Sequence, residues 1–170
     1  MKPELIYLSK YYWRLAYDCQ ETIMGKLRAT PNYTGIERPD RFAVGYLGEF
    51  AVSEYLFDSG VKHVHRIHLD GHSQRSEFLV GEREGGPTLE LEVKTAAQER
   101  YKNFMFPAAQ KIDADIFVGA RIESPMICAV ALWGWLPRSE VEALPIDDFG
   151  HGPTRHCLLA DMLDLAELPV

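Results

Sequence analysis

A stretch of strict alternation between apolar and charged residues constrains the fold of this chain more than any other feature. The stretch reads Leu89, Glu90, Leu91, Glu92, Val93 and Lys94. Because successive side chains of a β-strand point to opposite faces, this pattern predicts a strand with one apolar face and one charged face. A second short strand is predicted over residues 76–80, and the turn-rich residues 81–87 join the two strands.

Two strands joined in this way pair antiparallel, and the pairing determines which charged side chains meet. It brings Glu77, near the start of the first strand, level with Glu92 and Lys94 near the end of the second. Two carboxylates and one ammonium group in one place outline a metal-dependent hydrolytic site.

The length and composition of the chain are typical of one globular domain. Of its 170 residues, 46% are hydrophobic and 25% are charged, so we expect a single domain over residues 1–170. No apolar run approaches the roughly 20 residues that span a bilayer, and we expect no membrane association. Three scattered cysteines, Cys19, Cys128 and Cys157, indicate reduced thiols and a cytoplasmic location.

The formal net charge of -7 argues against nucleic-acid binding, because phosphate contacts require Lys and Arg. Carboxylates that hold divalent cations, however, count as negative in a formal sum and present positive charge once loaded. The net charge therefore does not exclude a metal-dependent enzyme that acts on nucleic acid.

Two helices are predicted ahead of the strands, one over residues 8–28 and one over residues 40–58. The second helix carries Glu49 in a stripe that is otherwise apolar or small. A carboxylate in that position either reaches an edge or lies against a positive group. Gly45 and Gly48 each cost the helix roughly 1 kcal/mol relative to Ala, which indicates the close approach of another element.

The remaining elements are predicted from apolar runs and turn residues. Strands are expected over residues 61–69, 114–122 and 126–135, a short helical turn over 106–112, a short helix over 137–144, and a loop over 144–155. The tail, residues 157–168, is compatible with strand, helix or both. Helices followed by strands and a further helix predict an α/β fold in which a central mixed β-sheet is flanked by helices.

Three short motifs follow one another in the order helix, strand, strand. They are Gly-x-x-Gly-Glu at residues 45–49, an acid that starts a short strand at Glu77, and Glu-x-Lys at residues 92–94. This order resembles the PD-(D/E)xK nuclease superfamily, and the strands at 114–118 and 126–135 are also similar to the family pattern. The resemblance spans roughly residues 40–138. It implies a restriction-endonuclease-like fold and a nuclease that cuts phosphodiester bonds in DNA with Mg²⁺ or Mn²⁺.

The resemblance also implies roles for the charged residues. Glu77, Glu92 and the carbonyl of Val93 would bind the cation, and Glu49 would be a direct or water-mediated ligand. Lys94 would orient or deprotonate the attacking water, or stabilise the transition state.

Four polar residues after the Glu-x-Lys motif would hold the phosphate backbone of the substrate. They are Gln98, Arg100, Lys102 and Lys111. A chain of this size that cuts both strands of DNA usually needs two copies, so we also expect a homodimer.

One position departs from the family pattern, because Glu77 stands where the first metal ligand is usually Asp. Asp70 is the substitute if Glu77 is not that ligand. This departure and the acidic balance of the chain favour a rival interpretation, in which a nuclease-like fold binds nucleic acid or a protein partner without cutting.

A second rival interpretation uses the histidines that lie close together in the sequence. They are His63, His65, His68 and His72. His63 and His65 share a strand face, which suits transition-metal ligation, and Asp70 could join them. The same pattern is compatible with a wet strand and loop that tolerate histidines.

Overall fold

The structure, a computed structural model, describes residues 2–29, 40–69, 76–81, 88–98, 100–124, 126–150 and 152–169. The helices are α1 (Lys10–Arg28), α2 (Arg41–Asp58) and α3 (Arg138–Ala143), with two 3₁₀ turns, η1 (Leu159–Asp161) and η2 (Leu165–Glu167). The strands are β1 (Glu4–Tyr7), β2 (His63–His65), β3 (Phe78–Gly81), β4 (Thr88–Ala96), β5 (Asn103–Pro107), β6 (Ile116–Ser124), β7 (Ala129–Pro137), β8 (Ile146–Asp148) and β9 (Pro153–Leu158). Asp70, His72 and most of the predicted link between β3 and β4 lie outside the described residues.

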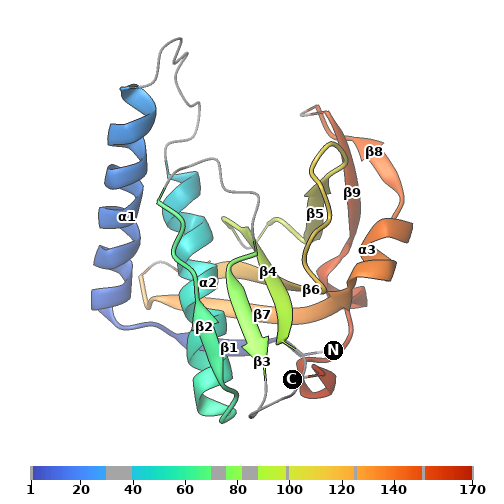
Figure 1. Cartoon of the computed structure of the whole chain (residues 1–170), viewed down its shortest axis with the longest axis horizontal. Coiled ribbons are helices and arrows are strands. Elements are labelled where there is room, and N and C mark those ends of the chain that lie inside the picture. Colours follow the sequence, from blue (N-terminus) through green and yellow to red (C-terminus); the bar gives the residue numbers. More distant parts are fainter. Residues whose placement is uncertain are drawn as a thin grey trace.

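A six-stranded mixed sheet lies at the centre of the fold, with the strand order β1-β7-β6-β4-β3-β2 (Figure 1). Strands β4 and β6 are parallel, and the other neighbouring pairs in this sheet are antiparallel. Phe78 of β3 lies opposite Leu91 of β4, which confirms the predicted antiparallel hairpin. The architecture is therefore mixed α/β, with a mixed sheet and helices packed on it.

The two long helices pack on one face of this sheet. Helices α1 and α2 lie side by side, and α2 contacts β4, β6 and β7 (Figure 1). Their buried side chains, among them Ala16, Ile23 and Leu27 of α1 and Leu47, Ala51 and Leu56 of α2, join the apolar face of the sheet in one core. Each fully buried large apolar side chain contributes roughly 1.5–3 kcal/mol, so this stripe is sufficient to dock the helices. None of the three described helices has the apolar length that a membrane crossing requires.

A second, three-stranded sheet with the order β5-β9-β8 differs from the sequence prediction. The first two residues of the turn expected over 106–112 belong to β5, and the loop expected over 144–155 contains β8 and the start of β9. The strand expected over 61–69 is reduced to β2. Phe104 and Phe106 of β5 are buried in a second core with residues of β6, β7 and α3. Burial against these partners outweighs the local turn signals from which the loop and the turn were predicted.

The main sheet opens at Phe78, where β3 begins. Pairing between β3 and β4 stops at Phe78 and Leu91, so within the described residues the C-terminal part of β4 has no strand partner on that side. Helix α2 lies against this part of β4, and a Cβ on Gly48 would fall 1.9 Å from Thr95 Oγ1. The predicted close approach is therefore confirmed at Gly48. It is wrong at Gly45, which has no such neighbour within 4 Å.

Candidate active site

Three carboxylates and one ammonium group converge where β3 and β4 separate. Because β3 and β4 are antiparallel and in the predicted register, Glu77 comes level with Glu92. Burial raises the pKa of Glu77, and the charges of Glu49 and Glu92 raise it further. The charge of Lys94 lowers the pKa of Glu77. Electrostatic effects of this kind act between nearby groups, so Glu49, Glu92 and Lys94 all lie near Glu77. The structure thus brings together the four residues that the sequence motifs indicated.

Glu77 is a buried acid whose pKa is raised to about 8, mainly by burial. Its side chain accepts one backbone hydrogen bond, from Val93 N–H to Glu77 Oε2 at 3.0 Å. The N–H and C=O of one strand residue point to the same side, so the Val93 carbonyl also points toward Glu77. Two of the oxygen donors expected for a cation therefore lie on the same side of β4.

The helix acid Glu49 is bonded to a histidine that the sequence motifs did not assign to this site. His65 Nε2 and Glu49 Oε2 lie 2.8 Å apart, and the two side chains are only 13% and 12% exposed. The His65 ring stacks on Phe78 with centroids 4.4 Å apart and meets Phe50 edge-on. Burial raises the pKa of Glu49 to about 8 and lowers that of His65 to about 4, so burial favours the neutral form of both groups. The expectation of a wet histidine is wrong at His65, which instead orients Glu49.

Glu92 and Lys94 form an ion pair, and one amide side chain bridges them. Gln110 Nε2 donates to Glu92 Oε1 at 2.9 Å, and Lys94 Nζ donates to Gln110 Oε1 at 3.3 Å. Lys94 Nζ also lies 5.0 Å from the ring centroid of Phe106. Gln110 follows β5 in the chain, and no sequence signal marked it. Its contacts hold Glu92 and Lys94 in a defined arrangement.

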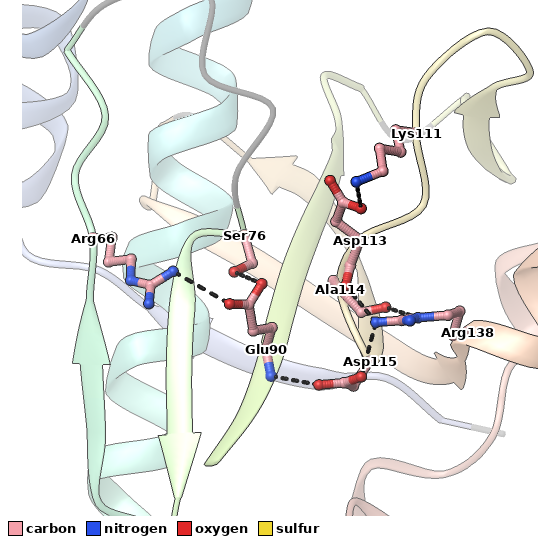
Figure 2. Close-up of polar contacts among 8 residues, drawn as sticks. All are labelled: Arg66, Ser76, Glu90, Lys111, Asp113, Ala114, Asp115 and Arg138. Carbon is pink, nitrogen blue, oxygen red and sulfur yellow. Dashed lines mark hydrogen bonds and ion pairs between the residues drawn. The ribbon is translucent and has the colours of Figure 1, made fainter.

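Glu90, the third charged residue on this face of β4, belongs to a different network (Figure 2). It accepts a hydrogen bond from Ser76 Oγ at 2.9 Å and lies 3.7 Å from Arg66. Its backbone N–H donates to Asp115 Oδ2 at 3.0 Å. Ser76 immediately precedes Glu77 in the chain, and the N–H of Arg66 donates to the Glu77 carbonyl. Glu90 therefore anchors the segment that presents Glu77 and is not itself a member of the acidic cluster.

A cavity of about 590 Å³ opens beside the cluster, and Lys94 is the cluster residue that lines it. Gln98 and Arg100, two of the four residues predicted to contact phosphate, also line this cavity. The other two, Lys102 and Lys111, are exposed outside the lining, and Lys111 Nζ lies 2.7 Å from a neighbouring carboxylate. The predicted phosphate contacts are thus divided between the cavity and the surrounding surface.

The described histidines near the site face separate partners. His63 Nε2 lies 2.9 Å from Ser53 Oγ, whereas His68 Nε2 lies 3.2 Å from the carbonyl oxygen of Ser76. His65 binds the helix acid as described above. The rings of these three residues are therefore not turned to one common ion. The remaining residues of the predicted set, Asp70 and His72, lie outside the described residues.

The donor atoms of the acidic cluster fit a hard divalent cation. Carboxylate and carbonyl oxygens are the ligands that Mg²⁺ and Mn²⁺ prefer, and a cation would relieve the repulsion that raises the pKa of Glu77. Among the described residues, no three His, Cys, Asp or Glu side chains are arranged to hold an ion as they stand. Glu49 is turned to its histidine and Glu92 to its lysine. Cation binding therefore requires these carboxylates to exchange a proton or a partner.

No protein-family model, no curated protein and no solved structure matches the chain. The function must therefore be inferred from the order of the motifs and from the geometry of the cluster.

Proposed function

We propose that this chain is a nuclease of the PD-(D/E)xK type, with a restriction-endonuclease-like fold, that hydrolyses phosphodiester bonds in DNA with Mg²⁺ or Mn²⁺. One observation carries the proposal: a helix and two strands bring Glu49, Glu77, Glu92 and Lys94 together beside a cavity. DNA is chosen as the substrate by analogy with the family. A homodimer stays a prediction, because a single chain does not test it.

In this proposal Glu77, Glu92 and the carbonyl of Val93 would hold the cation, and Glu49 would complete the oxygen ligands. When bound by these residues, such a cation would activate a water and neutralise the charge that develops on the scissile phosphate. Lys94, which reaches the cavity, donates hydrogen bonds to a phosphate oxygen or to the attacking water.

Two further residues support these groups in the proposed mechanism. His65 fixes the side chain of Glu49, and Gln110 aligns Glu92 with Lys94. Hydrogen-bond partners of this kind orient the groups that touch a cation and tune their basicity. His65 and Gln110 are therefore positioning residues.

A matched pair of variants tests the proposal, because Glu90 and Glu92 are identical side chains two residues apart on one face of β4. We expect wild-type protein to cleave plasmid or single-stranded DNA with Mg²⁺ or Mn²⁺ and not with EDTA. Glu92→Gln should lose roughly 10²–10³-fold of this activity, as expected when a group that stabilises the transition state is removed. Glu90→Gln should keep specific activity and lose some stability. Equal activity in Glu92→Gln and wild type would contradict the assignment.

A second candidate function is a binding module that does not cut. Two observations favour it: Glu77 occupies the usual Asp position, and Glu49 and Glu92 are already bonded to protein partners. Wild-type protein that binds DNA, cleaves none with either cation and keeps its affinity in Lys94→Ala would establish this candidate instead.

A further inference from the structure

We infer that the 590 Å³ cavity beside Lys94 holds one unstacked nucleotide of the DNA strand that is cut. This inference rests on the proposed function and narrows the substrate to DNA with a single-stranded or frayed nucleotide. The cavity lies between the N-terminal end of α2, the C-terminal end of β4 and strand β5. Its volume is within the range of pockets that enclose one small molecule. A base in a stacked duplex could enter it only after its base pair had been opened, whereas an unpaired base could enter directly.

The charges of the lining favour a phosphate-bearing ligand. Two exposed arginines, Arg41 and Arg100, line the cavity, and Asp40 is the only acid among the described lining residues. Lys94 adds a further ammonium group, although it is paired with Glu92. The wall is therefore locally positive in a chain whose net charge is -7.

The other lining side chains favour a flat ring with polar edges. Tyr101 and Met105 contribute an aromatic ring and a thioether to the lining, and the Tyr101 ring centroid lies 5.1 Å from the guanidinium carbon of Arg100. Phe104 also lines the cavity, but its ring is buried in the second core and is not offered to a ligand. Gln98 and Asn103 contribute amides, each of which both donates and accepts hydrogen bonds. Aromatic faces that stack on a base, together with arginines that contact the backbone, are the usual means by which proteins hold single-stranded nucleic acid.

The position of Lys94 links the cavity to the reaction. Its ammonium group pairs with Glu92 of the acidic cluster, and the residue also lines the cavity. A phosphate bound at Lys94 would therefore leave the adjoining nucleotide at the mouth of the cavity. The ligand is thus one nucleotide unit of a strand whose neighbouring phosphate lies at the cluster.

Binding in EDTA tests the inference independently of cleavage. With fluorescein-labelled oligo-dT and a duplex of the same length, anisotropy should show at least about tenfold tighter binding of the single strand. Arg41→Ala and Arg100→Ala should each weaken binding and reduce the slope of log K against log salt by about 0.7, the value for one lost phosphate contact on a single strand. Arg14→Ala, an exposed arginine of α1 outside the lining, is the charge-matched control and should change neither quantity.

A variant that fills the cavity tests occupancy by the base. Ala97 lines the cavity, and Ala97→Trp should abolish the preference for the single strand, whereas Ala143→Trp on the exposed end of α3 should preserve it. Equal wild-type affinity for both DNAs, or an unchanged preference in Ala97→Trp, would overturn the inference. Competition by free dTMP at the concentration of the oligonucleotide would indicate a free-nucleotide site and would overturn it as well. If wild-type protein prefers the single strand but does not cleave DNA with either cation, the result would contradict the proposed nuclease activity and not this inference.

Discussion

Replacing Glu77 with Gln should stabilise the metal-free protein, although Glu77 is a predicted metal ligand. Burial raises the pKa of Glu77 from its ordinary value of 4.5 to about 8. Between these pH values the folded protein keeps a proton that the unfolded chain releases, so stability decreases by about 1.4 kcal/mol per pH unit as pH rises. This penalty amounts to about 3 kcal/mol at pH 7, and it levels off above the folded-state pKa. Gln mimics the protonated acid and can still accept the hydrogen bond from Val93 N–H.

Urea unfolding in EDTA, at about pH 5 and about pH 7, measures this effect. Glu77→Gln should have nearly the stability of wild type at the lower pH and exceed it by up to about 3 kcal/mol at the higher pH. Glu142→Gln, which removes an exposed acid of α3, should track wild type at both pH values. Added Mn²⁺ should stabilise wild type and leave Glu77→Gln unchanged. A Glu77→Gln protein that is no more stable than wild type at pH 7 would refute the account of a buried, repelled carboxylate.

Three other predictions concern the surroundings of the cluster. Gln110→Ala should reduce metal-dependent cleavage by about 10- to 100-fold with little change in melting temperature, and unaltered kinetics would rule out a positioning role. Gly48→Ala would place a Cβ 1.9 Å from Thr95 Oγ1 and should destabilise the fold by ~1–3 kcal/mol in urea unfolding. Gly45→Ala, with no such neighbour within 4 Å, should stabilise it by ~1 kcal/mol, and similar shifts in both variants would refute the described packing of α2 on β4. The affinity for Mn²⁺, measured by calorimetry, should rise with pH up to about 8, because burial raises the pKa of Glu49 and Glu77 and the cation must displace their protons. The rise should be roughly tenfold per pH unit for each proton displaced. An affinity that does not change with pH would contradict proton displacement.

The parts of the fold that could be predicted from sequence are those with a strong local period. Helices α1 and α2 follow apolar spacings of three and four, and the β3–β4 hairpin follows strict alternation around a turn-rich link. Once the hairpin register is known, the meeting of Glu77 with Glu92 and Lys94 follows from strand geometry alone. The acidic cluster was therefore accessible from sequence.

The second sheet and the supporting residues were not accessible in the same way. Strands β8 and β9 begin in a segment rich in Gly and Pro, and β9 pairs with β5, which is distant in sequence. His65 and Gln110 reach Glu49 and the Glu92–Lys94 pair only through the fold. The alternating pattern could not distinguish the supporting role of Glu90 from the site role of Glu92. Their environments differ because Ser76 and Arg66 contact Glu90 and not Glu92.

Anomalous diffraction from a crystal soaked in Mn²⁺ would test the central claim most directly. The claim is that a helix and two strands present a common set of oxygen ligands to one divalent cation. We predict an anomalous peak within coordination distance of carboxylate oxygens of both Glu77 and Glu92, with the Glu49 side chain or an intervening water beside it. Full Mn²⁺ occupancy elsewhere in the molecule, with these carboxylates still bonded only to their protein partners, would contradict the claim.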